Sequence, residues 1–113
     1  MALRIGIDIV HIPRMAALTS IAKATALERM FHKVELTNKD PSHLAGILAV
    51  KESVFKALGK PPCWLDVTVE SSASGKPAVS ISPACKHASK ASIVDVSISH
   101  DGDYAIAMVL LEK

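Results

Sequence analysis

The chain has 113 residues, which is the length of one domain, 1–113, with a single core. Half of the residues are hydrophobic and only 4% are aromatic, so we expect a core of Ala, Val, Ile and Leu and exclude a disordered chain. The 13 basic and 11 acidic residues nearly cancel, which argues against a general nucleic-acid binder.

The cysteines and the apolar runs indicate the compartment. Cys63 and Cys85 are too few for a disulfide framework and too far apart for a CxxC unit, so we expect reduced thiols. No apolar run approaches the roughly 20 residues of a membrane span, and the chain begins with a strand-like segment instead of an apolar signal block. The expected location is therefore the cytoplasm.

Residues 3–10 predict a β-strand, because apolar side chains alternate along them. Gly6 and Asp8 share the opposite face of this strand. Aspartate is rare in strands, so Asp8 is either an exposed or strand-end carboxylate or a functional group. The apolar face consists of Leu3, Ile5, Ile7 and Ile9.

The next segment, from Pro13 to about Phe31, has a helical pattern with a proline near its first turn. It is the basic part of the chain. A run of charges is usually a solvated helix face, so by itself it predicts no partner. Its cations are Arg14, Lys23, Arg29 and Lys33.

A long helix is predicted between Asp40 and Gly59. Asp40 suits the N-cap, Pro41 suits the first helical position, and Gly59 suits the left-handed residue that ends a helix. Pro61 and Pro62 prevent its continuation.

Within this helix the stretch LAVKESVFKALG places Lys51 at the centre of an apolar stripe. In one interpretation, Lys51 extends along the surface to water, while Glu52 and Lys56 form an exposed pair. In the other, this helix face borders a cleft that binds an anion. The helix alone does not choose between them.

The second half of the chain predicts four strands, over residues 65–70, 78–82, 93–98 and 104–111. The segment between 82 and 93 is a loop or a short helix. The Asp-Gly pair in SHDGD predicts a hairpin between the last two strands, with Ser99 and His100 at its turn. The expected fold is α+β, an antiparallel sheet packed against one long helix and a shorter N-terminal helix.

Asp8 and Glu52 are the two carboxylates that these patterns leave unexplained. If the long helix packs across the sheet, they approach closely enough to share a hard cation such as Mg2+, which binds carboxylates, phosphate oxygens and water. Lys51, Lys56 and Lys76 would then surround a phosphorylated substrate, and His100 would add a donor.

Taken together and in order, these elements resemble the holo-acyl-carrier-protein synthases, the small 4'-phosphopantetheinyl transferases. The resemblance spans nearly the whole chain. It is carried by GIDIV followed by Arg14, LERMF followed by EL, LAGILAVKESVFKALG, GKP, and VSISHDGDYAIAMV.

The resemblance implies a 4'-phosphopantetheinyl transferase-like fold and a Mg2+-dependent enzyme. That enzyme moves the phosphopantetheine arm of coenzyme A to a serine of apo acyl carrier protein and releases adenosine 3',5'-bisphosphate. Asp8 and Glu52 would hold the Mg2+, Lys56 would contact the phosphates, and Glu52, Asp8 or a metal-bound water would be the general base. The coenzyme A site would be lined by Lys51, Gly75, Lys76, Pro77, Ser99 and His100.

The resemblance also implies two protein partners. Acyl carrier proteins are acidic beside their modified serine, so the basic helix would dock them. The docking residues would be the cations Arg14, Lys23 and Arg29 with the apolar anchors Met15 and Phe31. Members of the family assemble as homotrimers with active sites between subunits, so we expect a homotrimer.

One departure from the family lies in the long helix. Members commonly carry an arginine and an aromatic residue where this chain has Ile47 and Leu48. An alternative function is therefore a non-catalytic coenzyme A or nucleotide-binding module of the same fold. A third is a purely structural oligomerisation domain, which would have no metal dependence.

Overall fold

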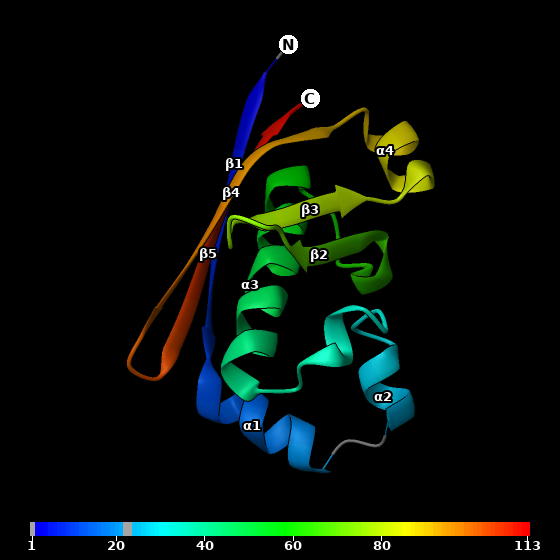
Figure 1. Ribbon diagram of the computed structural model, residues 1–113. Helices are drawn as coiled ribbons and strands as arrows, with labels where there is room; N and C mark the ends of the chain where they lie inside the picture. The colour runs from blue at the N-terminus through cyan, green and yellow to red at the C-terminus, as the bar shows by residue number, and fades with distance from the viewer. Residues whose placement is uncertain (1, 22–23) are drawn as a thin grey trace.

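The computed structural model describes residues 2–21 and 24–113 and has the expected α+β architecture (Figure 1). Two short 3-10 turns, Glu35–Thr37 and Trp64–Asp66, flank the longest helix. The helices and strands are, in chain order, β1 Leu3–His11, α1 Ile12–Ile21, α2 Ala24–Glu28, α3 Pro41–Leu58, β2 Val67–Ser71, β3 Pro77–Ile81, α4 Pro83–Ser89, β4 Ser92–Asp101 and β5 Tyr104–Glu112.

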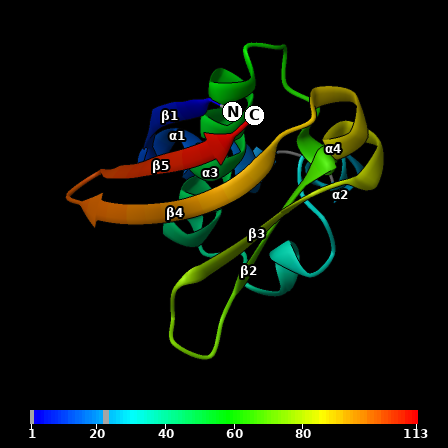
Figure 2. The same cartoon turned by 90° about the horizontal axis from the view of Figure 1, so that it is seen from above.

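The strands form two antiparallel sheets instead of one. The larger sheet has the order β1-β5-β4, and β2 pairs only with β3. Helix α3 packs on one face of the larger sheet and also contacts α1 and β2. Viewed along α3, the β2-β3 hairpin lies beyond β4, the edge strand that β3 contacts (Figure 2). Helix α3 therefore contacts both sheets and α1 and fixes their positions relative to one another.

Local sequence signals set both ends of α3. The side chain of Asp40 accepts a hydrogen bond from the Ser42 backbone N–H at 2.9 Å, which caps the first turn. Gly59 follows the last turn with φ of 71°, the left-handed conformation that glycine adopts without strain. Both predicted ends of this helix are confirmed.

Strand β1 and α3 approach each other closely at Gly6. A Cβ atom on Gly6 would lie 1.9 Å from the Ser53 carbonyl oxygen, so only glycine fits there. Asp8 lies two residues further on the same strand face and therefore also points toward α3. The predicted division of β1 into two faces is confirmed.

The apolar face of β1 is turned away from α3 and is exposed in the single chain. Its side chains are 54% to 64% exposed. Ile106 and Met108 of β5 pair with β1 residues of this face and are also exposed. The β1 members of this outer face are Leu3, Ile5, Ile7 and Ile9.

Two segments differ from their predictions. The helix expected from Pro13 to Phe31 is divided, since α1 ends at Ile21 and α2 covers only Ala24–Glu28. Ser99 and His100 are not at the hairpin turn, because β4 continues to Asp101. His100 still pairs with Ala105 there, and only the next two residues after Asp101 form the loop.

The segment after β3, which the sequence left undecided, is a short helix. The Ser82 side chain accepts a hydrogen bond from the Cys85 backbone N–H and caps α4. Within residues 2–21 and 24–113, no helix combines the length and the apolar character needed to cross a membrane.

Candidate active site

Asp8, Glu52 and Lys56 meet where β1 crosses the second half of α3. Lys56 Nζ lies 2.8 Å from Asp8 Oδ1 and 3.2 Å from the Ile7 carbonyl oxygen. The three side chains line a cavity of about 580 Å³ that extends past the end of α3 to Pro62. The close approach at Gly6 brings them together, because it presses β1 against this part of the helix.

The carboxyl groups of Asp8 and Glu52 are adjacent, so the negative charge of one disfavours ionisation of the other. Partial burial, a hydrogen bond with Asp8 and repulsion by its charge raise the pKa of Glu52 from 4.5 to about 7, although Arg14 and Lys56 act in the opposite direction. The hydrogen bond to Asp8 raises the pKa of Lys56. Lys56 thus pairs with Asp8, so the exposed Glu52 and Lys56 pair of the first interpretation does not form.

One oxygen of this cluster lacks a partner. Asp8 Oδ2 is buried and has no hydrogen bond. A buried carboxylate oxygen without a donor is costly, whereas a bound cation would satisfy it. Two neighbouring carboxylates are the oxygen ligands that Mg2+ uses when waters and substrate phosphates complete its shell. In the described part of the chain, no group of three or more His, Cys, Asp or Glu side chains is arranged for metal binding.

Lys51, one residue before Glu52, is in a different environment. Its side chain is fully buried, and Nζ lies 2.8 Å from Glu35 Oε1. Nζ also donates to the Trp64 carbonyl at 3.0 Å and to the Val67 carbonyl at 2.8 Å. An ammonium has three protons, and all three are used. The prediction that Lys51 lines the coenzyme A site is wrong, and Lys51 does not reach water as the first interpretation supposed.

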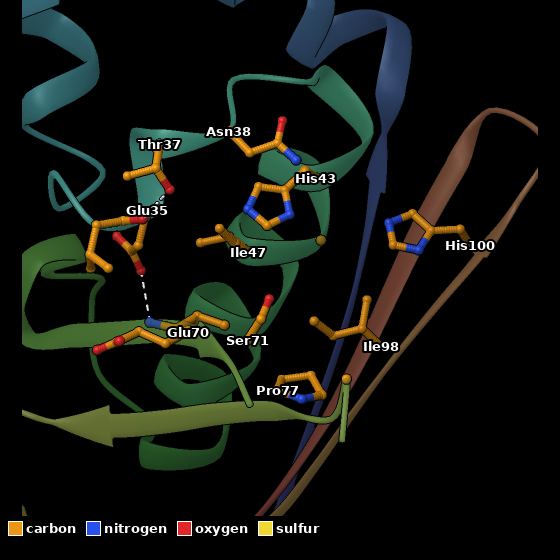
Figure 3. Close-up of a pocket in the computed structure, with 14 residues that line it drawn as sticks. Glu35, Thr37, Asn38, His43, Ile47, Glu70, Ser71, Pro77, Ile98 and His100 are labelled. Carbon is orange, nitrogen blue, oxygen red and sulfur yellow. Dashed lines mark hydrogen bonds between the residues drawn. The ribbon is translucent and has the colours of Figure 1, made fainter. Parts of the chain in front are cut away.

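Glu35 is the partner that the sequence did not reveal. Its carboxylate accepts hydrogen bonds from the His32 N–H at 2.7 Å and from the Val69 N–H at 2.8 Å, the latter dashed in Figure 3. With Lys51, these bonds connect the turn before α3, the helix itself and β2. Desolvation lowers the pKa of Lys51, and Glu35 counteracts this effect. The pair therefore acts as a structural crosslink.

A second cavity, of about 550 Å³, lies beside the first half of α3 (Figure 3). Gly75, Pro77 and His100 line it, as do His43 and Ile47 of the helix. His100 Nε2 lies 3.0 Å from the Ser42 carbonyl oxygen, which fixes the imidazole against α3. Because Ile47 forms part of the wall, the wall is apolar at the position where this chain departs from the family that it resembles.

Two predicted residues do not line this second cavity. The Lys76 ammonium forms an ion pair with Asp95 of β4, in a neighbouring cavity of about 530 Å³ that Gly75 and Pro77 also line. Ser99 alternates with His100 along β4 and pairs in register with Ile106 on the outer face of the sheet. The candidate residues therefore form separate groups within one chain.

The predicted docking residues also divide. Arg14 and Arg29 are exposed, whereas Lys23 lies outside the described residues. Met15 is 2% exposed and Phe31 is 1% exposed, and both belong to the hydrophobic core. The prediction that these two side chains are docking anchors is therefore wrong, because they are already buried within the chain.

Comparisons with known proteins identify the family of this chain. A family model described as the 4'-phosphopantetheinyl transferase superfamily matches residues 4–109. A holo-[acyl-carrier-protein] synthase of Protochlamydia amoebophila is 41% identical, with 97% of this chain and 98% of the relative covered. The corresponding protein of Sulfurimonas denitrificans is 36% identical, with 96% and 94% covered.

Solved structures show the same fold. The Helicobacter pylori holo-[acyl-carrier-protein] synthase in complex with coenzyme A superposes with a TM-score of 0.89 at 32% identity, covering 96% of this chain and 99% of that one. The Neisseria meningitidis enzyme gives a TM-score of 0.85 at 28% identity, covering 97% and 98%. The chain therefore belongs to the 4'-phosphopantetheinyl transferase superfamily.

Proposed function

We propose that this protein transfers the 4'-phosphopantetheine arm of coenzyme A to a serine of apo acyl carrier protein, releasing adenosine 3',5'-bisphosphate. The observation that carries the proposal is the meeting of Asp8, Glu52 and Lys56 in one cavity of a chain from this superfamily. A passive binding module has little need for two adjacent carboxylates whose mutual repulsion Arg14 and Lys56 offset only in part.

Asp8 and Glu52 would hold Mg2+, and Lys56 would stand beside the reacting phosphate. Bound Mg2+ would neutralise the diphosphate and the leaving group. The serine oxygen forms a bond to the phosphorus that carries pantetheine, and the bond from that phosphorus to the bridging oxygen breaks. Negative charge then spreads over the phosphate oxygens, and the Lys56 ammonium stabilises this charge. The serine proton goes to Glu52, Asp8 or a water molecule.

Coenzyme A would use residues from both cavities. His43 lies near the start of α3 and Lys56 lies near its end, 13 residues further on, which corresponds to a rise of about 20 Å along the helix. Within one subunit Gly75, Pro77 and His100 line a different cavity from Asp8 and Glu52. A neighbouring copy of the chain would supply the second group.

We therefore infer that the protein assembles as a homotrimer with its sites between subunits. The support is the outer face of the larger sheet, where four β1 side chains and two β5 side chains form one exposed apolar surface. Stable monomers rarely expose a surface of this kind. Ser99 borders this face, so an assembled interface can bring it near the substrate from another subunit.

Acyl carrier protein would dock beside the carboxylate cluster. Arg14 is exposed, and its charge acts on Glu52, so a partner attracted by Arg14 would arrive next to the reacting phosphate. Arg29 is a second exposed cation in the same basic segment of the chain. An acidic partner held in this way should bind more weakly as the salt concentration rises.

A cytoplasmic location stays a prediction.

The test is intact-protein mass spectrometry of apo acyl carrier protein after incubation with this protein, coenzyme A and Mg2+. The expected result is a gain equal to one phosphopantetheine group, absent with EDTA and much slower with Glu52→Gln. Bound coenzyme A without any gain, with several acidic carrier proteins, would instead support the non-catalytic binding module. An unchanged Glu52→Gln reaction would contradict the assigned role of the carboxylates.

A further inference from the structure

Lys60 is a second cation in the cavity that holds the carboxylate cluster. It follows Gly59, the left-handed residue that ends α3, and its side chain is exposed. It lines the cavity with Asp8, Glu52 and Lys56. The proposed transfer reaction assigns a role to each of those three side chains but none to Lys60.

The ammonium of Lys60 has only weak partners. Nζ lies 3.7 Å from Cys85 Sγ and 5.9 Å from the centre of the Phe55 ring. In residues 2–21 and 24–113 no carboxylate lies within ion-pair distance of it. Its charge contributes to lowering the pKa of Asp66, but hydrogen bonds from Ser82 and Cys63 contribute more. Lys60 is therefore available to an anionic ligand.

Lys56, unlike Lys60, already has an ionic partner within the protein. Its ammonium pairs with Asp8 at 2.8 Å, so part of its charge is balanced within the protein. A diphosphate carries two negative charges and several acceptor oxygens. Once it enters the cavity, Lys60 can exchange a thiol and an aromatic face for a charged oxygen, which is a stronger partner.

We propose that Lys60 binds the diphosphate of coenzyme A and thereby contributes to the affinity for this substrate. The inference rests on the proposed transferase function, because it assumes that coenzyme A places its diphosphate at the carboxylate cluster. A purely structural role is the alternative. The contribution of Lys60 to the end of α3 comes from its backbone N–H, which bonds to the Phe55 carbonyl at 3.2 Å. Side-chain substitution leaves that bond intact.

The test compares Lys60→Met with Lys60→Arg and with Lys86→Met, a matched loss of an exposed lysine on α4 that does not line this cavity. Calorimetry with Mg2+ measures the binding of coenzyme A and of dephospho-coenzyme A, which keeps the diphosphate and lacks the 3'-phosphate. Lys60→Met is expected to weaken both by about tenfold, the effect of one charged hydrogen bond. Lys60→Arg should retain most of the affinity, and Lys86→Met should match the wild type.

Steady-state kinetics gives a second readout. The KM for coenzyme A is expected to rise in Lys60→Met, while the KM for acyl carrier protein stays unchanged. Unchanged binding of both ligands, a loss for coenzyme A alone, or a rise confined to the KM for acyl carrier protein would each overturn the assignment. A wild-type protein that transfers no phosphopantetheine would overturn the proposed function instead, so the two failures are distinguishable.

Discussion

Lys51 and Glu52 are neighbours on α3, yet they belong to two regions with opposite properties. Lys51 and Glu35 form a dry ion pair in which every ammonium proton has an acceptor. Glu52 is half-buried beside Asp8, whose Oδ2 has no hydrogen bond. The protein itself completes the first charge cluster, whereas the second holds two adjacent carboxyl groups that take up a proton or would accept a bound cation. This difference separates a structural pair from a candidate catalytic one better than residue type does.

The largest effect is expected from breaking the structural pair. Glu35→Gln removes the carboxylate and leaves the charge of Lys51 buried without an ionic partner. Breaking a buried ion pair in this way typically costs ~3 to 5 kcal/mol of the free energy of unfolding. Chemical denaturation of the purified variant measures this loss.

A double variant sharpens the interpretation. Glu35→Gln combined with Lys51→Met leaves no buried charge and is expected to recover part of the lost stability. If the double variant is no more stable than Glu35→Gln alone, the cost arises from lost hydrogen bonds to the backbone and not from the unpaired charge.

Breaking the second cluster should change activity instead of stability. Glu52→Gln removes one of two carboxylates that would hold the metal, and transfer is expected to fall on the order of 10²- to 10³-fold, as for removal of one electrostatic group from an active site. The melting temperature should not fall, because the substitution also relieves the repulsion from Asp8. Mass spectrometry and thermal denaturation measure the two effects.

Glu28→Gln is the matched control, since Glu28 is an exposed glutamate on α2. It should leave both quantities unchanged. A clear fall in the melting temperature of Glu52→Gln would mean that Glu52 has a structural role like that of Glu35, and the contrast between the two clusters would then fail.

The ends of α3 and the two faces of β1 were predictable because their signals are local. Asp40, Gly59 and the alternation along β1 act within a few residues. The meeting of Asp8 and Glu52 depends on β1 crossing α3, which spacing alone cannot show. It was expected from the family resemblance. The raised pKa of the Glu52 carboxyl group, in contrast, emerges only from the structure.

The misassigned residues depended on tertiary partners. Lys51 is satisfied by Glu35, which lies in a turn 16 residues earlier, and by carbonyls that follow the helix. No pattern within the helix identifies those partners. Met15 and Phe31 could serve equally well as surface anchors or core side chains, and only packing decides between the two. Sequence patterns thus identified which residues are unusual more reliably than what surrounds them.

A smaller effect, which extends to the carboxylate cluster, is expected from Gly6→Ala. The added Cβ would collide with the Ser53 carbonyl oxygen and push β1 away from α3. Overpacking of this kind costs ~1 to 3 kcal/mol. It should also separate Asp8 from Glu52, so that the affinity for Mn2+, measured by electron paramagnetic resonance, falls together with stability. Loss of stability with full Mn2+ affinity would show that the cluster does not depend on this contact.

The smallest effect concerns pH. The pKa of Glu52 is raised from 4.5 to about 7, so protonated Glu52 stabilises the metal-free protein. This contribution is complete below pH 4.5 and is lost as the pH rises through about 7. Metal binding must displace the same proton, so Mg2+ affinity is expected to rise by up to about tenfold per pH unit below that pKa. Calorimetry in buffers of different ionisation enthalpy measures the released proton. Glu52→Gln should lose both the decline in stability and the proton release, and persistence of either one would contradict the assignment of this proton to Glu52.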